Sequence, residues 1–166
     1  MSTDITKQLS GNPEDYINDP LLEQLWTMKA VEHMKIHFNL ISAIDPKMLR
    51  LTPKDDEVYK AFRSTFPELD IAVIDINSLK SPAAKEVWRP FCNQFQGIIE
   101  DFNYATLLRL DCKKDYGDDN TEVVPRIQFL AIEVARNREG FNDSIRSVYG
   151  KTAGVEQATD NSKQES

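Results

Sequence analysis

The sequence of 166 residues lacks several features that define other classes of protein. No apolar run approaches the roughly 20 residues needed to cross a bilayer. Residues 1–11 show no basic region followed by an apolar block, so we expect neither a membrane partner nor a secretory signal. The six glycines are scattered, whereas a phosphate-binding loop clusters them ahead of a helix. We therefore expect a cytoplasmic protein that binds no nucleotide by that route.

Cysteine is scarce, and basic residues are outnumbered by acidic ones, 20 to 27. The two cysteines, Cys92 and Cys112, do not have the short spacing of metal ligands. Because intracellular glutathione keeps such pairs reduced, we expect two thiols and no disulfide. The net charge of -7 argues against a nucleic-acid partner, since affinity for phosphate backbones comes largely from Lys and Arg. A basic protein surface is the better electrostatic match for this chain.

Catalytic motifs are also missing from the sequence. No serine lies in a Gly-x-Ser-x-Gly turn, and no Asp-x-Asp pair offers to hold a nucleotide sugar. Glu100 and Asp101 are adjacent, so on a helix they diverge by about 100° and cannot easily face one bond. The acids of residues 113–122 do not follow the order of a calcium loop, and we interpret them as a solvated loop.

His33 and His37 have a spacing that allows metal binding on a helix. The metalloprotease pattern places Glu directly after the first His, whereas Met34 stands there. We interpret the pair as core or boundary histidines held by hydrogen bonds. The sequence thus predicts no catalytic residue, no cofactor and no metal.

The composition that remains is that of an ordinary globular chain, with 40% hydrophobic and 28% charged residues. Its length suits one domain with a single core, and we expect a monomer. Residues 1–18 show no sustained period and predict a mobile lead-in. Residues 19–149 form the predicted helical domain, and residues 150–166 turn polar and predict a disordered tail.

Three helix starts share one signal, an N-cap residue followed by proline at the first helical position. These are Asp19-Pro20, Thr52-Pro53 and Ser81-Pro82. The helix after Ser81 carries apolar residues from Ala84 to Phe102 at spacings of four and three, which is one helix face. Pro90 lies inside this pattern and predicts two helical pieces around residues 88–91.

Two short segments are ambiguous, and a fourth helix is clear. Residues 71–76 fit a small strand or a buried extended link, of which we favour the link. Residues 104–110 continue the preceding helix or straighten. A helix then begins at Pro125, with a core stripe that includes Ile127, Leu130 and Val134. These signals predict a mainly α fold, a single compact orthogonal bundle of several helices, which leaves room for one short extended or strand segment.

The side of the last helix opposite its core stripe mixes apolar and charged residues. Such a mixture is either a second buried contact or a docking patch rimmed by charges. The helix also ends in an ionic run before Gly140. The candidate partner-binding residues are Phe129, Ile132, Glu133, Arg136, Asn137 and Arg138.

Four segments of the chain resemble the family called polysaccharide biosynthesis domain-containing protein 1. They are KEVWRPF at 85–91, IEDFNYATLLRLD at 99–111, RIQF at 126–129 and ARNREG at 135–140. Weaker similarity extends back through the first helix, so the resemblance covers roughly residues 16–145. Both ends of the chain fall outside it.

The resemblance implies a small cytosolic eukaryotic protein with a mainly helical fold. It further implies a non-enzymatic chaperone that binds newly made translation elongation factor 1 alpha and helps its GTP-binding domain to fold, with ribosome association as a related expectation. One alternative is a passive protein-binding adaptor. Another is an enzyme of polysaccharide biosynthesis, as the family name suggests, although the sequence offers no nucleotide-sugar site.

Overall fold

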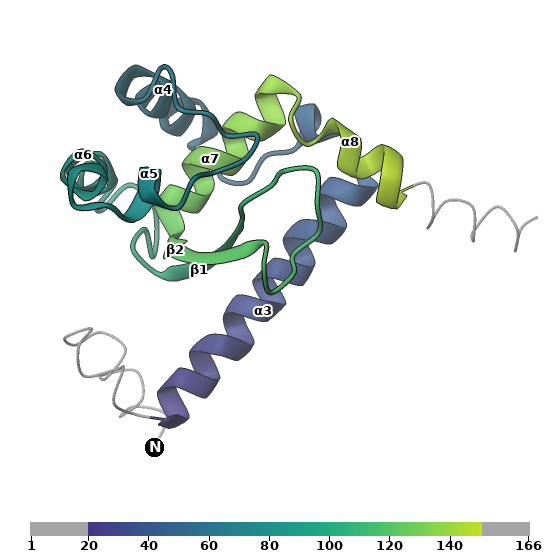
Figure 1. Cartoon of the computed structure of the whole chain (residues 1–166), viewed down its shortest axis with the longest axis horizontal. Helices are drawn as coiled ribbons and strands as arrows, with labels where there is room; N and C mark the ends of the chain where they lie inside the picture. The colour runs from purple at the N-terminus through teal and green to yellow at the C-terminus, as the bar shows by residue number, and fades with distance from the viewer. Residues whose placement is uncertain (1–19, 151–166) are drawn as a thin grey trace, which may run out of the picture.

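The computed structural model of the chain describes residues 20–150. Apart from Gly150, the predicted lead-in and tail lie outside these residues. The elements in chain order are α3 (Pro20–Ala43), η1 (Pro46–Met48), α4 (Asp55–Thr65), α5 (Asn77–Lys80), α6 (Pro82–Asn93), β1 (Ala105–Arg109), β2 (Thr121–Pro125), α7 (Arg126–Glu139), α8 (Asp143–Ile145) and η2 (Arg146–Gly150). The mainly α class is therefore confirmed (Figure 1). Across the described range, no helix has the length and apolarity to cross a membrane.

Helix starts follow the predicted signals, with one shift. The Ser81 hydroxyl accepts the Ala84 N–H at 3.1 Å and caps α6, and Pro82 takes the first turn. The second helix begins at Asp55 and not directly after Pro53. The Asp55 carboxylate reaches back to the N–H groups of Leu51 and Thr52, both at 2.9 Å. These two bonds hold residues 51–54 as a turn ahead of α4.

Helix α6 runs through Pro90 without a break, so the prediction of two helical pieces is wrong. Proline lacks the N–H that would bond the carbonyl of Glu86. Glu86 lies on the exposed side of α6, where water can satisfy that carbonyl. Trp88 and Phe91 consequently stay together on the buried side, at 3% and 2% exposure.

The apolar pattern beyond Asn93 does not continue as helix, contrary to the spacing up to Phe102. Gly97 at φ 81° and Asp101 at φ 54° both adopt the left-handed conformation, which ends helical geometry. The resulting turns bury Ile99 to 6% exposure and leave Ile98 at 46%. The helical spacing of apolar residues thus continues to Phe102, although the helix itself ends at Asn93.

The strands β1 and β2 form an antiparallel pair in which Ala105 lies opposite Pro125 and Arg109 opposite Thr121. Residues 104–110, left open between helix and extended chain, are thus mostly strand. The predicted loop 113–122 gives its last two residues to β2, which the sequence analysis did not anticipate. Residues 71–76 form the favoured extended link, with a single bridge from Val73 to Asp111. The link is buried only in part, because Ile71 and Ile74 face the core while Val73 and Ile76 are exposed.

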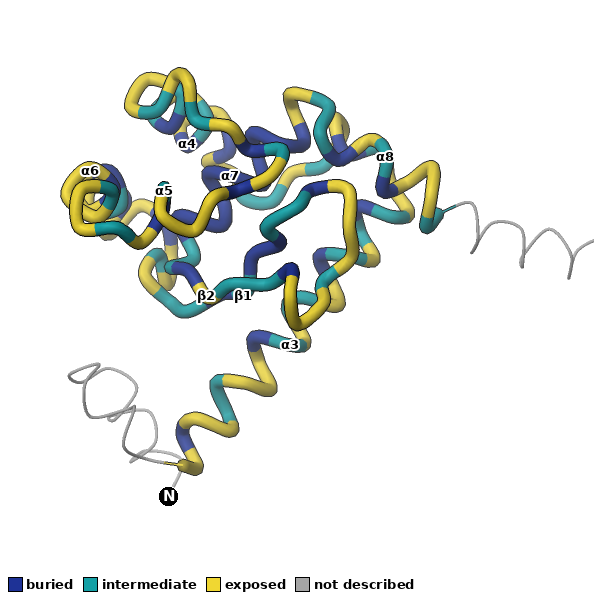
Figure 2. The backbone as a smooth tube through the Cα atoms, in the orientation of Figure 1, coloured by how far each residue is buried: buried dark blue, intermediate teal, exposed yellow. Residues whose placement is uncertain are grey.

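Helix α7 occupies the middle of the molecule, with α4 and α6 on one side and the sheet and α3 on the other (Figure 1). Figure 2 shows α7 buried along nearly its whole length, while the first half of α3 is mostly exposed. The indole N–H of Trp26 donates to the Ala105 carbonyl at 3.1 Å and ties α3 to β1. Both cysteines, Cys92 and Cys112, are free thiols as predicted.

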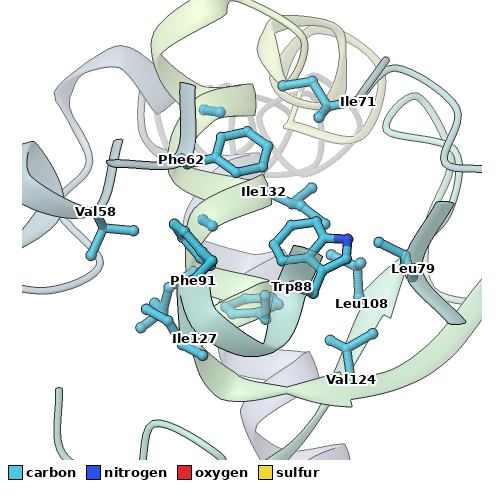
Figure 3. Packing of buried hydrophobic residues seen from close by; sticks show 14 of the residues in the cluster. Val58, Phe62, Ile71, Leu79, Trp88, Phe91, Leu108, Val124, Ile127 and Ile132 are labelled. Atoms are coloured by element: carbon cyan, nitrogen blue, oxygen red, sulfur yellow. The ribbon is translucent and has the colours of Figure 1, made fainter. Parts of the chain in front are cut away.

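The apolar core gathers aromatic rings between α4, α6 and α7 (Figure 3). Trp88 stacks on Phe62 and Phe66 with centroids 5.9 and 4.1 Å apart, and Phe91 meets Trp88 edge-on at 5.5 Å. Such pairs add about 0.5–1.5 kcal/mol each beyond the area that they bury. The buried members of this cluster are all apolar, in contrast to the other side of α7.

Candidate protein-binding site

Helix α7 has well-defined ends because of its flanking residues. Pro125 is extended (φ -60°, ψ 147°) and starts the helix, and Gly140 ends it in the left-handed conformation (φ 87°). The Gly140 N–H bonds the Arg136 carbonyl, which is a usual way to close a last turn. Every residue from Ile127 to Asn137 is buried. Elements therefore cover α7 on all sides, and not only along its predicted core stripe.

Phe129 and Ile132 lie in the interior at 1% and 0% exposure. The ring of Phe129 meets His33 and His37 of α3 edge-on, with centroids 5.1 and 5.0 Å apart. Ile132 belongs to the main apolar cluster. For this apolar pair, the structure bears out the reading of a second buried contact.

Glu133 is fully buried and lies among cationic partners. The guanidinium of Arg109 donates to both carboxylate oxygens at 3.1 Å, and an Arg136 nitrogen lies 3.5 Å away. The Asn142 amide donates to one oxygen at 3.2 Å. Glu133, Arg109 and Arg136 each have 0% exposure, so the core holds one anion between two cations. We call Arg109, Glu133, Arg136, Asn137 and Asn142 the Glu133 network.

The protonation states of Glu133 and His37 in this interior do not change near neutral pH. Burial alone would raise the pKa of Glu133, but Arg109 and Arg136 outweigh it and lower the pKa to about 2. Burial lowers the pKa of His37 to about 4, although Glu133 opposes that shift. Glu133 is therefore charged and His37 neutral across the physiological range.

Arg136 donates hydrogen bonds to backbone carbonyls and also lies beside the Glu133 carboxylate. It donates to Ile71 through Nε at 2.7 Å, to Arg109 through Nη1 at 2.9 Å and to Leu110 through Nη2 at 2.9 Å. These acceptors come from the extended link and from β1 and its following residue. One side chain thus joins α7 to two segments distant from it in the sequence.

Asn137 and Asn142 complete the Glu133 network. The Asn142 oxygen accepts from Arg109 at 2.7 Å, and its amide donates to the Asn137 oxygen at 2.7 Å. Both residues are buried, at 2% and 0% exposure. This chain of bonds ties the end of α7 to the segment that follows Gly140.

The expectation of an exposed docking patch on this face of α7 is wrong for five of the six candidate residues. Spacing on one helix could not reveal that Arg109 and Asn142 supply the partners that make a buried carboxylate tolerable. The five buried residues are Phe129, Ile132, Glu133, Arg136 and Asn137. Only Arg138 among the six reaches solvent, at 35% side-chain exposure.

Arg138 belongs to a surface cluster where the end of α7 meets α4. It pairs with Asp56, and its guanidinium carbon lies 5.3 Å from the centre of the Tyr59 ring. Beside it, Glu139 accepts from Arg63 at 2.7 and 2.8 Å and from the Tyr59 hydroxyl at 3.0 Å. We call these five residues the α4–α7 rim.

The two acids of the rim, Asp56 and Glu139, are partly solvated and are held in their charged form. The hydrogen bond from Arg138 lowers the pKa of Asp56, and that from Arg63 lowers the pKa of Glu139. Side-chain exposures run from 20% for Arg63 to 69% for Asp56. The rim therefore presents positive and negative side chains around one aromatic ring to a binding partner.

The histidines behave in part as predicted. His37 Nδ1 lies 2.9 Å from the Tyr116 hydroxyl, so it has a hydrogen-bond partner, while His33 Nδ1 has none in the described structure. Within residues 20–150, no cluster of three or more His, Cys, Asp or Glu is arranged to hold a metal ion.

Sequence reasoning missed Arg109, Asn142 and Tyr116 as members of this interior. One signal was available for Arg109, because a lone arginine among Leu107, Leu108 and Leu110 is unusual in a buried strand unless it is paired. Asn142 and Tyr116 lie in loops and carry no pattern that points inward.

Comparisons with known proteins cover most of the chain. A family model described as PBDC1 protein matches residues 22–147. Protein PBDC1 of Mus musculus is 52% identical over 141 residues, which are 85% of this chain and 71% of the mouse protein. Protein PBDC1 of Homo sapiens is also 52% identical over 141 residues, but these make up 60% of the human protein.

A solved structure shares the fold. The solution NMR structure of a Saccharomyces cerevisiae protein matches this chain with a TM-score of 0.73 at 39% sequence identity. The match covers 83% of this chain and 97% of the yeast chain. At this identity, the likeness extends beyond the general arrangement of helices to the sequence that forms them.

Proposed function

The chain belongs to the PBDC1 protein family, and from that premise we propose that it is a non-enzymatic folding helper for translation elongation factor 1 alpha. It binds the GTP-binding domain of the newly made factor and prevents its misfolding. It acts in the cytoplasm as a monomer and meets its client near the ribosome. The family match over residues 22–147 supports this role. The net charge of -7 suits a client with basic surface.

The fixed ionisation of the interior supports a binding role over catalysis. General acid and base catalysts have pKa values near the working pH. With pKa values of about 2 and about 4, Glu133 and His37 do not exchange protons there. The carboxylate of Glu133 is also engaged by Arg109 and Asn142. This buried polar cluster therefore suits stability and positioning better than the chemistry of a polysaccharide enzyme.

We propose the α4–α7 rim as the contact with the client. Arg138 is the candidate residue that reaches solvent, and Tyr59 supplies an aromatic surface beside it. Aromatic and arginine side chains are enriched among residues that dominate binding energy. Glu133, Arg136 and Asn137 contribute from beneath, because they fix the last turns of α7 from which Arg138 extends.

The test is translation of elongation factor 1 alpha in an extract depleted of this protein. Purified protein is added back, and the soluble, protease-resistant fraction of the GTP-binding domain is measured. Wild-type protein should restore that fraction. Arg138→Glu should restore less, because it removes the arginine that lies over the Tyr59 ring and pairs with Asp56 at the proposed contact.

A matched control is Lys29→Glu, which makes the same change of charge at an exposed position on α3. It should restore the fraction as wild type does. If wild-type protein changes nothing, the folding role fails. Binding of the client without any change in its soluble fraction would instead identify a passive adaptor, and saturable binding of a nucleotide sugar would favour the enzyme.

A further inference from the structure

A groove of about 460 Å³ opens between the α5–α6 region and β2. Leu79 and Trp88 give it an apolar floor on the helix side, together with Phe102 from the turn that precedes β1. Val123 and Pro125 of β2 form the opposite wall. Figure 3 shows Leu79, Trp88 and Val124 gathered at this side of the core. The groove is apart from the α4–α7 rim.

One edge of β2 faces away from β1, as the hydrogen-bond pattern shows. The Arg126 N–H bonds the Tyr104 carbonyl at 2.7 Å, and the Leu110 N–H bonds the Asn120 carbonyl at 2.9 Å. Hydrogen-bonded and non-hydrogen-bonded pairs alternate along an antiparallel ladder. With the observed register, Val123 falls in a non-hydrogen-bonded pair. Its N–H and C=O groups therefore point to the outer edge.

The same alternation directs the backbone of Thr121 outward. In residues 20–150, no backbone group outside the sheet bonds the main chain of Thr121 or Val123. Val123 is 38% exposed. An edge with unused donors and acceptors is a template for another strand.

The charged side chains along the groove are all cationic, although the chain carries a net charge of -7. Lys80 is paired with Glu122 at the β2 wall. Lys85 and Arg89 lie one turn apart on α6, are exposed, and form no ion pair within the described part of the chain. Two cations are thus available above an apolar floor.

We propose that this groove binds an extended segment of another polypeptide, with alternating apolar and acidic residues, as an added strand on β2. Main-chain bonds to Thr121 and Val123 provide the pairing. Apolar side chains of the segment lie over Trp88, and its acidic side chains pair with Lys85 and Arg89. The inference depends on the groove alone and requires no particular client.

The test uses the full chain and a fluorescein-labelled, acetylated hexapeptide of alternating valine and glutamate, with binding followed by fluorescence anisotropy. The glutamate peptide should bind, and the same peptide with lysine in place of glutamate should bind about tenfold more weakly. A third peptide carries N-methyl groups on the amides of one edge. It keeps every side chain but cannot pair as a strand, so its binding should be lost.

Two sets of variants locate the site. Lys85→Glu with Arg89→Glu should reverse the preference, so that the lysine peptide binds better. Lys29→Glu with Lys35→Glu makes the same charge change on exposed positions of α3 and should leave the preference as it was. Val123→Pro removes the outward N–H without touching the ladder to β1 and should weaken binding, whereas Val123→Thr should not.

Several outcomes would overturn the proposal. These are no binding at the solubility limit of the peptides, equal affinity for glutamate and lysine peptides, and an unchanged preference in the Lys85, Arg89 variant. A dimer in sedimentation that Val123→Pro converts to monomer would mean that a second copy occupies the edge. Displacement of the peptide by a single-stranded RNA oligonucleotide at lower concentration would mean that the cations serve nucleic acid. None of these assays contains elongation factor 1 alpha, so their failure is separate from that of the proposed function.

Discussion

Glu133 and Glu139 lie on the same helix and each pairs with an arginine, but their surroundings differ completely. The Glu133–Arg109 pair has 0% exposure on both sides at 3.1 Å. The Glu139–Arg63 pair is shorter, at 2.7 Å, with side-chain exposures of 24% and 20%. Desolvation makes the loss of one buried partner costly, whereas solvent screens the loss at the surface. Burial, and not distance, therefore decides which pair the fold depends on.

The largest expected effect comes from removing the charge of Glu133. Glu133→Gln leaves Arg109 and Arg136 as two buried cations without a counter-ion and should lower the free energy of unfolding by about 3–5 kcal/mol. The midpoint of urea unfolding measures this loss. Glu133→Asp keeps the charge and should lose less. Equal losses for both variants would show that shape, and not charge, sets the cost.

As the pH falls, the free energy of unfolding should first decrease because of His37 in the interior, before the acids of the rim become protonated. His37 has a pKa of 6.5 when unfolded and about 4 when folded, so the unfolded chain binds the proton more readily between these values. The free energy of unfolding should therefore fall as the pH drops from 6.5 to 4, by about 3 kcal/mol. Glu133 adds a further loss between pH 4.5 and 2, because its pKa is lowered on folding.

Urea unfolding at a series of pH values tests this, with His37→Gln expected to flatten the slope above pH 4.5. His33→Gln is the control. Its pKa is also lowered, chiefly by burial, but the residue is only partly buried and should contribute a smaller slope. A wild-type protein with no slope between pH 6.5 and 4.5 would contradict the assignment of His37.

A smaller effect is expected for the rim pair. Glu139→Gln removes the negative charge facing Arg63 but keeps an oxygen that accepts hydrogen bonds. Because both side chains are partly solvated, the free energy of unfolding should fall by about 1 kcal/mol or less. A loss near that of Glu133→Gln would remove the distinction between the two regions. Measurement in high salt should shrink the effect further.

The smallest effect is expected at Arg138. Arg138→Gln gives up the pair with Asp56 at the most solvated position of the rim, so the melting temperature should stay close to that of wild type. Thermal unfolding followed by circular dichroism checks this. A clear drop in melting temperature would show that Arg138 supports the fold, and its use as a test of client binding would then need a milder substitution.

Local signals in the sequence predicted where helices begin, but they did not predict what surrounds each side chain. Ser81 caps α6 and Pro125 starts α7 because both effects act within one turn of chain. The burial of Glu133 depends on Arg109, which belongs to a different element and carries no local mark of the pairing. The amphipathic pattern of α7 therefore suggested a surface that other elements cover.

The errors around α6 and β2 have separate physical reasons. Proline is unfavourable inside helices in general, but the carbonyl freed by Pro90 lies on the exposed side of α6, so the helix continues. The strand β2 is short and follows a loop rich in acids, which masks its β-branched residues Val123 and Val124. It forms by pairing with β1 and by burying Val124 in the core, neither of which local propensity reports.

The three carbonyl bonds of Arg136 have a consequence for how the molecule opens. They join α7, the link containing Ile71, and the β1 end at Arg109 and Leu110 through a single side chain. None of these segments can separate without leaving a buried guanidinium or carbonyl unsatisfied. They should therefore open as one cooperative unit, and their amide protons should exchange with solvent only when the whole domain unfolds. Slow exchange would then mark the region held by Arg136, while the solvated first half of α3 exchanges by local fraying.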